Sequence, residues 1–205
     1  NGVPFAENPS NGDCRVCGSL ASLCGLEGAL EHGDQKAIDD AVKRMLLLYG
    51  ITFSIGGIPL LYSSDEIAKL NDYSYRNDDS KKHDDRWVNR IAVTEQDTAL
   101  ALSPSKALSP QQSASKAVFE GLQKMLQIRK TNAVFGDATT HILESDNQHC
   151  FAFLREGHDN QKLLVICNFS EHVQQVSGDI LNTIERKRCS DLLTGSTIDG
   201  NEALI

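Results

Sequence analysis

The spacing of hydrophobic residues changes near residue 136, and this change limits what the chain can fold into. Before that point, two segments repeat apolar residues every three or four positions, as one face of a helix does. After it, short apolar runs alternate with turn residues, which is the pattern of β-strands. The sequence therefore predicts an α/β first part followed by an all-β module. The two helical stripes are Ile38, Ala41, Val42, Met45, Leu46 and Tyr49, and Val118, Phe119, Leu122, Met125 and Leu126.

Apolar runs and turn residues give the expected elements. We predict helices at 19–31, closed by Gly33, at 38–49 and at 115–130. The continuously apolar run at 58–62 predicts a strand buried on both faces, as in a parallel sheet. Polar residues from 65 to 113 predict a long functional loop with an exposed Ser/Pro-rich part at 103–112. The strands expected after Gly136 lie at 139–143, 149–155, 162–169 and 172–176.

Charge and hydropathy exclude two classes of partner. The formal net charge is −8, whereas nucleic-acid binding needs a basic face, so we expect no nucleic acid as a partner. No apolar run approaches the roughly 20 residues of a membrane span, so we expect no membrane partner. Neutral ligands such as sugars stay compatible with this composition.

The six cysteines are expected to be reduced thiols. Cys150 and Cys167 lie inside apolar strand-like runs, where a thiol acts as a small hydrophobic group. Reduced thiols favour an intracellular compartment. Cys14 and Cys17 have zinc-knuckle or redox spacing, but no second such pair and no matching histidine pair completes a site. We therefore expect neither a metal ion nor a cofactor.

Three phrases of the sequence resemble one group of enzymes. Residues 57–66 read GIPLLYSSDE, which is similar to the eighth-strand signature of the α-amylase superfamily. Residues 71–76, NDYSYR, followed by DDRW at 84–87, resemble the next loop of amylosucrases. PSNGDCRVCG at 9–18 resembles their segment after the seventh strand. The chain is thus similar to the amylosucrase-like group of the superfamily.

This resemblance implies a particular fold. Residues 1–133 would form the last quarter of a (β/α)8 barrel, from loop 7 to helix 8. Residues 134–205 would form the β-sandwich that follows the barrel, with its last strand cut. Barrel enzymes build their sites from the loops at the C-terminal ends of the strands, where the polar segment after Tyr62 would lie.

The resemblance also implies retaining chemistry on a glucosyl unit, in which one carboxylate attacks the anomeric carbon and another protonates the leaving oxygen. The family's catalytic acids follow strands 4, 5 and 7, upstream of Asn1. We therefore assign no catalytic residue to this chain. His83-Asp84-Asp85 spells the family's seventh-strand tripeptide, but it follows the expected eighth strand instead.

Substrate recognition is the role that the resemblance leaves to this chain. Arg86 corresponds to the family arginine that pairs with an acid of an earlier loop and closes the floor of the glucose subsite; a guanidinium group suits this because it binds a carboxylate in a bidentate fork. Arg15 corresponds to an arginine near the fructose or acceptor subsite, with a loop arginine tied to Asp13 as the alternative. Asp65 and Glu66 would end strand 8 and either bind sugar or hydrogen-bond the residues that do, and Asp72 would either line the pocket or pack within the loop.

The expected activity is glucosyl transfer from sucrose to an α-glucan or oligosaccharide acceptor, with release of fructose. A sucrose hydrolase or related α-glucosidase with the same residues is the alternative within the superfamily. A non-catalytic carbohydrate-binding fragment is the alternative outside it. Against a binding module, no Trp or Tyr follows Trp87, although exposed sugar platforms use such rings.

Overall fold

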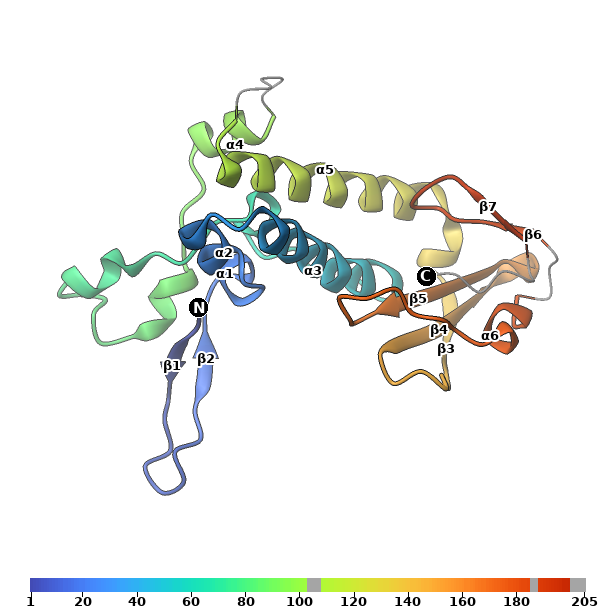
Figure 1. Cartoon of the computed structure of the whole chain (residues 1–205), viewed down its shortest axis with the longest axis horizontal. Helices are drawn as coiled ribbons and strands as arrows, with labels where there is room; N and C mark the ends of the chain where they lie inside the picture. Colours follow the sequence, from blue (N-terminus) through green and yellow to red (C-terminus); the bar gives the residue numbers. More distant parts are fainter. Residues whose placement is uncertain (103–107, 185–187, 200–205) are drawn as a thin grey trace. The chain divides into compact units, whose positions relative to one another are not determined.

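The computed structural model describes residues 1–102, 108–184 and 188–199 (Figure 1). Contacts between residues group the chain into two units, of which the first comprises Asn1–Leu46 and Leu61–Leu122. The second comprises Leu47–Leu60 and Gln123–Ile205. Each unit therefore takes up two separate stretches of chain. The domain boundary at residue 133 stays a prediction.

The predicted helix at 19–31 is two short helices, α1 (Leu20–Leu23) and α2 (Leu26–His32). Gly25 separates them with a φ of 95°, a left-handed conformation that breaks the helical path. Gly33 ends α2 in the same region of φ, as predicted. The break follows from backbone conformation, because the apolar pattern alone continues across residue 25.

Both predicted long helices are confirmed, as α3 (Gln35–Ser54) and α5 (Pro110–Thr131). In α3 the predicted stripe is buried except for Leu46, which is half-buried; Met45 is fully buried, and burial extends beyond the stripe to Phe53 and Ser54. A capping box begins α5: the backbone N–H of Ser109 donates to Oε1 of Gln112, whose own N–H donates to Oγ of Ser109. Pro110 fits the first helical position because that residue needs no N–H partner.

The predicted strand at 58–62 is wrong for this structure. The segment is irregular, and Ile58 and Leu60 are 90% and 80% exposed. A strand obtains its backbone hydrogen bonds from a neighbouring strand, and the described residues pair none with this segment. An apolar run of strand type thus lies in water.

The predicted loop at 65–113 contains short elements. They are the 3₁₀ turns η1 (Asp65–Ile67), η2 (Tyr73–Asn77) and η3 (Asp85–Asn89), and the helix α4 (Glu95–Ala101). Of the Ser/Pro-rich part, residues 103–107 lie outside the described residues, and Ser109, Pro110 and Gln111 are exposed as predicted.

In the second unit, three of the four predicted strands are confirmed. They form one antiparallel sheet in the order β3–β4–β5, with Asn147 in the first connection and the turn η5 in the second. The fourth, expected at 172–176, is irregular, although Val176 is buried beside Cys150, Ala152 and Ile180. The bounds of this sheet are β3 (Ala138–Leu143), β4 (Cys150–Gly157), η5 (His158–Asn160) and β5 (Lys162–Asn168). The other elements of the second unit are the turn η4 (Ala133–Phe135) and the helix α6 (Gly178–Asn182). A separate antiparallel pair consists of β6 (Arg188–Ser190) and β7 (Thr197–Asp199).

Arg155 on β4 is buried, with 2% of its surface exposed. Its guanidinium group donates hydrogen bonds to one hydroxyl and four backbone carbonyls, which satisfies most of its donors without a carboxylate partner. The hydroxyl, of Thr140, is 2.6 Å from Nη1. The carbonyl groups belong to Ile55, Val134, Phe135 and Gly136. This one side chain thus ties the residues after α3 to η4 and to the sheet.

All six cysteines are free thiols in this structure. Burial, together with the nearby Cys150, raises the pKa of Cys167 to about 11. None of the helices in the described residues has the length and apolar character of a membrane-spanning helix. The described strands form separate antiparallel sheets. Since a barrel closes through strands from all of its quarters, the barrel and sandwich stay predictions.

Candidate functional site

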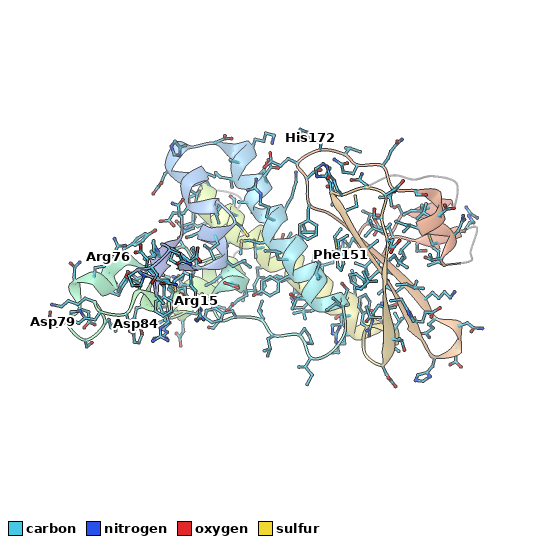
Figure 2. The ribbon with its side chains drawn as sticks, turned by 90° about the horizontal axis from the view of Figure 1, so that it is seen from below. Arg15, Arg76, Asp79, Asp84, Phe151 and His172 are labelled. Carbon is cyan, nitrogen blue, oxygen red and sulfur yellow. The ribbon has the colours of Figure 1, made fainter. Side chains whose placement is uncertain are left out.

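The candidate site lies in the first unit, where the hairpin β1 (Val3–Phe5) and β2 (Arg15–Cys17) contacts η3, and η3 contacts η2. Val3, Tyr75 and Val88 form a small buried cluster beneath this region, with Cys17 and Trp87 packed against it. Figure 2 labels Arg15 on β2, Arg76 on η2, and Asp79 and Asp84 in the connection between η2 and η3. The apolar cluster holds the polar loop residues on a fixed base.

Two aspartates cap the 3₁₀ turns of the site. Asp72 precedes η2 and accepts a hydrogen bond from the backbone N of Ser74 at 2.8 Å. Asp84 precedes η3 and accepts one from the backbone N of Arg86 at 3.1 Å. The N–H of Asp72 also donates to the carbonyl of Val88, which links the two turns. Hydrogen bonds from Ser74 lower the pKa of Asp72.

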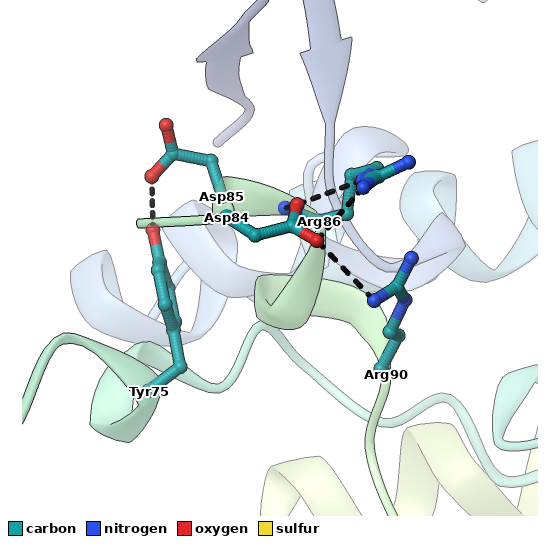
Figure 3. A network of polar contacts seen from close by, with 5 residues as sticks. All are labelled: Tyr75, Asp84, Asp85, Arg86 and Arg90. Carbon is teal, nitrogen blue, oxygen red and sulfur yellow. Dashed lines mark hydrogen bonds and ion pairs between the residues drawn. The ribbon is translucent and has the colours of Figure 1, made fainter. Parts of the chain in front are cut away.

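Arg86 is held by a bidentate fork. Its Nε lies 2.7 Å from Oδ1 of Asp84 and its Nη2 lies 2.9 Å from Oδ2 (Figure 3). The guanidinium carbon is 5.1 Å from the ring centroid of Phe5, a cation–π contact. Half of the side chain is exposed, and among the described residues Nη1 has no hydrogen-bond partner. One N–H edge of a positioned guanidinium therefore faces solvent.

Arg90 shares the carboxylate of Asp84. Its Nη1 lies 3.4 Å from Oδ2 of Asp84, and its guanidinium carbon is 5.0 Å from the ring centroid of Trp87. Lys81 also lies over the Trp87 ring, at 5.0 Å. The hydrogen bond and charge of Arg86, with the nearby Arg90, lower the pKa of Asp84 despite some desolvation. A single carboxylate thus serves two guanidinium groups.

Asp85 makes a separate contact. The hydroxyl of Tyr75 donates to Oδ1 of Asp85 at 2.6 Å (Figure 3). Burial, and then this hydrogen bond, raise the pKa of Tyr75. Both acids of the His83-Asp84-Asp85 tripeptide therefore have structural partners within the loop.

Arg15 lies on β2, exposed and directly across the hairpin from Phe5. Opposite residues of an antiparallel pair project to the same face, so Arg15 and Arg86 both neighbour the Phe5 side chain. Among the described residues no ion pair joins Arg15 to Asp13, whose carboxylate instead accepts a hydrogen bond from Nδ2 of Asn11. Both predicted sugar-binding arginines, Arg15 on the hairpin and Arg86 on η3, thus lie beside Phe5.

Asp65 and Glu66 lie on η1, outside the Asp84 network. Asp65 is buried, with 7% exposed. Oε2 of Glu66 is buried and has no hydrogen-bond partner among the described residues. Ser64 and Ala68, on either side of the turn, have left-handed backbones with φ of 89° and 50°, so η1 has an unusual local conformation.

The site residues that the sequence analysis did not predict are Asp84, Arg90, Tyr75 and Asp85.

Other features of the described residues supply no second site of this kind. No group of three or more His, Cys, Asp or Glu side chains is arranged there to hold a metal ion. An open pocket of about 460 Å³ lies in the second unit. It contains none of the predicted sugar-binding residues, and it is lined by Pro59, Leu126, Arg129, Lys130, Asn132, Ala133 and Gly136.

Comparison with known proteins gives a partial similarity to a curated enzyme. No family model matches the chain. A stretch of 53 residues, 26% of this chain, is 45% identical to trehalose-6-phosphate hydrolase of Bacillus subtilis (strain 168). The matched stretch spans 9% of the length of that enzyme. This partial similarity supports the broad α-amylase superfamily of glycoside hydrolases and does not distinguish among its members.

Proposed function

We propose that this chain is the C-terminal part of a sucrose-acting, retaining α-glucosyl transferase of the amylosucrase type. The motifs at 71–76 and 84–87 support the finer assignment, and the similarity to a hydrolase supports the superfamily. The observation that carries the proposal is the fork between Asp84 and Arg86. It fixes, within the loop that resembles a sugar-binding loop, a guanidinium group with one free N–H edge.

The proposed division of labour leaves chemistry to another part of the protein. A nucleophilic carboxylate and a general acid from the other barrel loops form and resolve the glucosyl-enzyme intermediate. Arg86 and Arg15 bind the donor and the acceptor or leaving group through N–H donors. Arg86 pairs with Asp84 in this chain, and its Nη1 stays available for a further acceptor.

The exposed apolar run at 58–62 supports the proposed barrel. Ile58 and Leu60 are almost fully exposed, although their sequence is that of a strand buried on both faces. Pairing with strands of the rest of the barrel would satisfy the backbone of this segment and cover both side chains. The segment would then be the eighth strand, and the loop from Asp65 onward would begin at the catalytic mouth.

Hydrolysis is the second candidate, because the identified relative is named a hydrolase. The same recognition residues serve either reaction, and the acceptor of the glucosyl unit decides between them. A transferase releases fructose and builds α-glucan from sucrose. A hydrolase releases glucose and fructose in equal amounts.

The test uses the full-length protein that contains the proposed barrel, incubated with sucrose, with sugars measured by chromatography. We expect α-glucan and fructose from it, and no turnover by the 205-residue chain alone. Failure of the full-length protein to cleave sucrose refutes the proposal. Equal glucose and fructose without glucan supports the hydrolase instead.

Substitution of Arg86 tests the assigned residue. Arg86→Ala should lower kcat/KM for sucrose roughly tenfold or more, because donor contacts are lost. Arg86→Lys should restore little, since an ammonium group cannot reproduce a planar fork. Lys82→Ala is the matched control, because Lys82 is an exposed cation of the same loop outside the Asp84 network. Normal kinetics in Arg86→Ala would remove Arg86 from the site.

A further inference from the structure

Asp84 caps η3 and also makes contacts with two arginines that capping does not require. Asp72 caps η2 through one backbone N–H and contacts no arginine among the described residues. Asp84 makes the equivalent contact on η3 and adds three guanidinium contacts, two to Arg86 and one to Arg90 (Figure 3). Both aspartates thus accept a hydrogen bond from the backbone N–H two residues later. The extra contacts therefore identify a second role for the Asp84 carboxylate.

Aromatic rings complete the hold on both arginines. Arg86 lies over Phe5 and Arg90 lies over Trp87, with guanidinium carbons 5.1 and 5.0 Å from the ring centroids. A ring beneath a planar cation restrains its tilt, and a carboxylate at its edge restrains its rotation. Each guanidinium is thus restrained in two directions, and Nη1 of Arg86 has no hydrogen-bond partner among the described residues.

The rings themselves are occupied by these cations. The Trp87 ring makes cation–π contacts with Arg90 and Lys81. The Tyr73 ring makes one with Arg76, whose guanidinium carbon is 5.0 Å from the ring centroid, and the Phe5 ring makes one with Arg86. A sugar that stacked on these faces would have to displace a cation. Recognition at this loop is therefore better served by guanidinium N–H donors, which suit the oxygen acceptors of a saccharide.

We propose that Asp84 is a positioning residue that holds Arg86 and Arg90 together as one N–H donor surface for sugar oxygens. Arg90 joins the recognition residues under this assignment. The sugar as ligand rests on the proposed function, whereas the positioning of the guanidinium groups does not. The two parts can be tested separately.

Positioning is tested by NMR on the whole 205-residue chain. The measured quantity is the rate at which the Nε–H proton of Arg86 exchanges with water. The signal of this proton is assigned by its disappearance in Arg86→Lys. Asp84→Ser keeps an oxygen that can cap η3 and removes the fork. We expect it to speed exchange at Arg86 roughly three- to tenfold, the range for one partly exposed charge-assisted bond. Asp72→Ser, the matched cap, should leave Arg86 exchange unchanged.

Two results overturn the positioning role. One is unchanged Arg86 exchange in Asp84→Ser; the other is equal acceleration in Asp72→Ser, which would mean that the whole loop had loosened. Should Asp84→Ser unfold the loop, as judged by the amide of the buried Val88, Asp84→Asn replaces it. Asparagine keeps the cap and the shape but not the charge, so faster Arg86 exchange is again expected, and its absence is again decisive.

The sugar-binding part is tested in the full-length enzyme with sucrose. Asp84→Ser should raise KM several-fold with a smaller change in kcat. It should have no further effect once Arg86→Ala and Arg90→Ala are both present, because its action passes through those side chains. An additive effect in that background overturns the assignment. Absence of any sucrose turnover by the unsubstituted enzyme instead refutes the proposed function, and the exchange result still decides the positioning.

Discussion

Nη1 of Arg155 donates a hydrogen bond to the carbonyl oxygen of Ile55 at 3.1 Å, across 100 positions of sequence. The same nitrogen crowds the next residue, because a Cβ added to Gly56 would lie 2.5 Å from it. Gly56 also has a φ of 119°, which side-chain-bearing residues rarely adopt. The chain after α3 thus passes the guanidinium at a distance that glycine alone accommodates.

The first prediction compares the two neighbouring glycines. Gly56→Ala should destabilise the fold by at least about 3 kcal/mol, because backbone strain and the contact with Arg155 act together. Gly57→Ala, at a φ of 70° with no atom within 4 Å of the added Cβ, should cost about 1 kcal/mol. Urea denaturation measures both. Equal losses would show that the contact with Arg155 adds nothing.

The second prediction concerns Arg155 itself. Arg155→Met removes the donors of five hydrogen bonds and should destabilise the second unit by about 3 kcal/mol or more. Arg155→Lys should recover part of this loss. Lys124→Met, which removes a positive charge from an exposed position on α5, is the control and should change stability little. The measurement is thermal denaturation, monitored by circular dichroism. Equal melting temperatures for the two methionine variants would contradict the role of Arg155.

The third prediction concerns the close approach of α3 and α5 in the first unit. A Cβ on Gly121 would lie 2.6 Å from a methyl carbon of Leu46, so Gly121→Ala should cost about 1–3 kcal/mol despite alanine's better helix propensity. Gly50→Ala is the control on α3, where the added Cβ would lie 3.9 Å from the terminal methyl carbon of Met125; it should stabilise by about 0.5–1 kcal/mol. Adding Leu46→Ala to Gly121→Ala should cost less than the two changes separately.

The fourth prediction follows from the pair formed by Lys69 and Asp97, which are 2.6 Å apart. Desolvation raises the pKa of Asp97, but the Lys69 ion pair and hydrogen bonds from Thr94 outweigh it and lower the pKa from 3.8 to about 2. The folded pKa is below the unfolded one, so this stabilisation is present above about pH 4 and is lost as pH falls through about 2.

Asp97→Asn tests this dependence. It should cost about 1–2 kcal/mol at pH 7, and the difference from the unsubstituted protein should shrink towards zero between pH 4 and pH 2. Asp79→Asn is the exposed control, since the Asp79 side chain is 93% exposed. A stability difference for Asp97→Asn that stays constant down to pH 2 would contradict the pKa assignment.

Periodicity predicted the elements whose structure is decided locally. The stripe from Ile38 to Tyr49 is buried along α3, and the alternating runs around Phe153 and Ile166 pair as β4 and β5. Gly25 was harder to interpret, because a glycine within a helical pattern usually continues the helix at a modest cost. Its left-handed backbone is a property of conformation that residue spacing does not encode.

Elements that depend on a distant partner were harder to predict. Residues 58–62 have the composition of a buried strand, but composition does not supply the neighbouring strand. At the candidate site, Arg86 was expected to meet an acid from another loop, whereas its fork is with Asp84, two residues earlier. An Asp two positions before an Arg at the start of a turn was the available signal. The link between Tyr75 and Asp85 had no such signal, because it depends on how η2 and η3 pack.

The burial of Cys167 lowers the reactivity of its thiol towards oxidants. Peroxides and disulfides react with thiolates, and a pKa of about 11 keeps the buried thiol of Cys167 protonated at neutral pH. Cys14, on the exposed connection between β1 and β2, has no such shield. Oxidative modification should therefore begin at Cys14, next to Arg15 of the hairpin, before it reaches Cys167 in the sheet of the second unit.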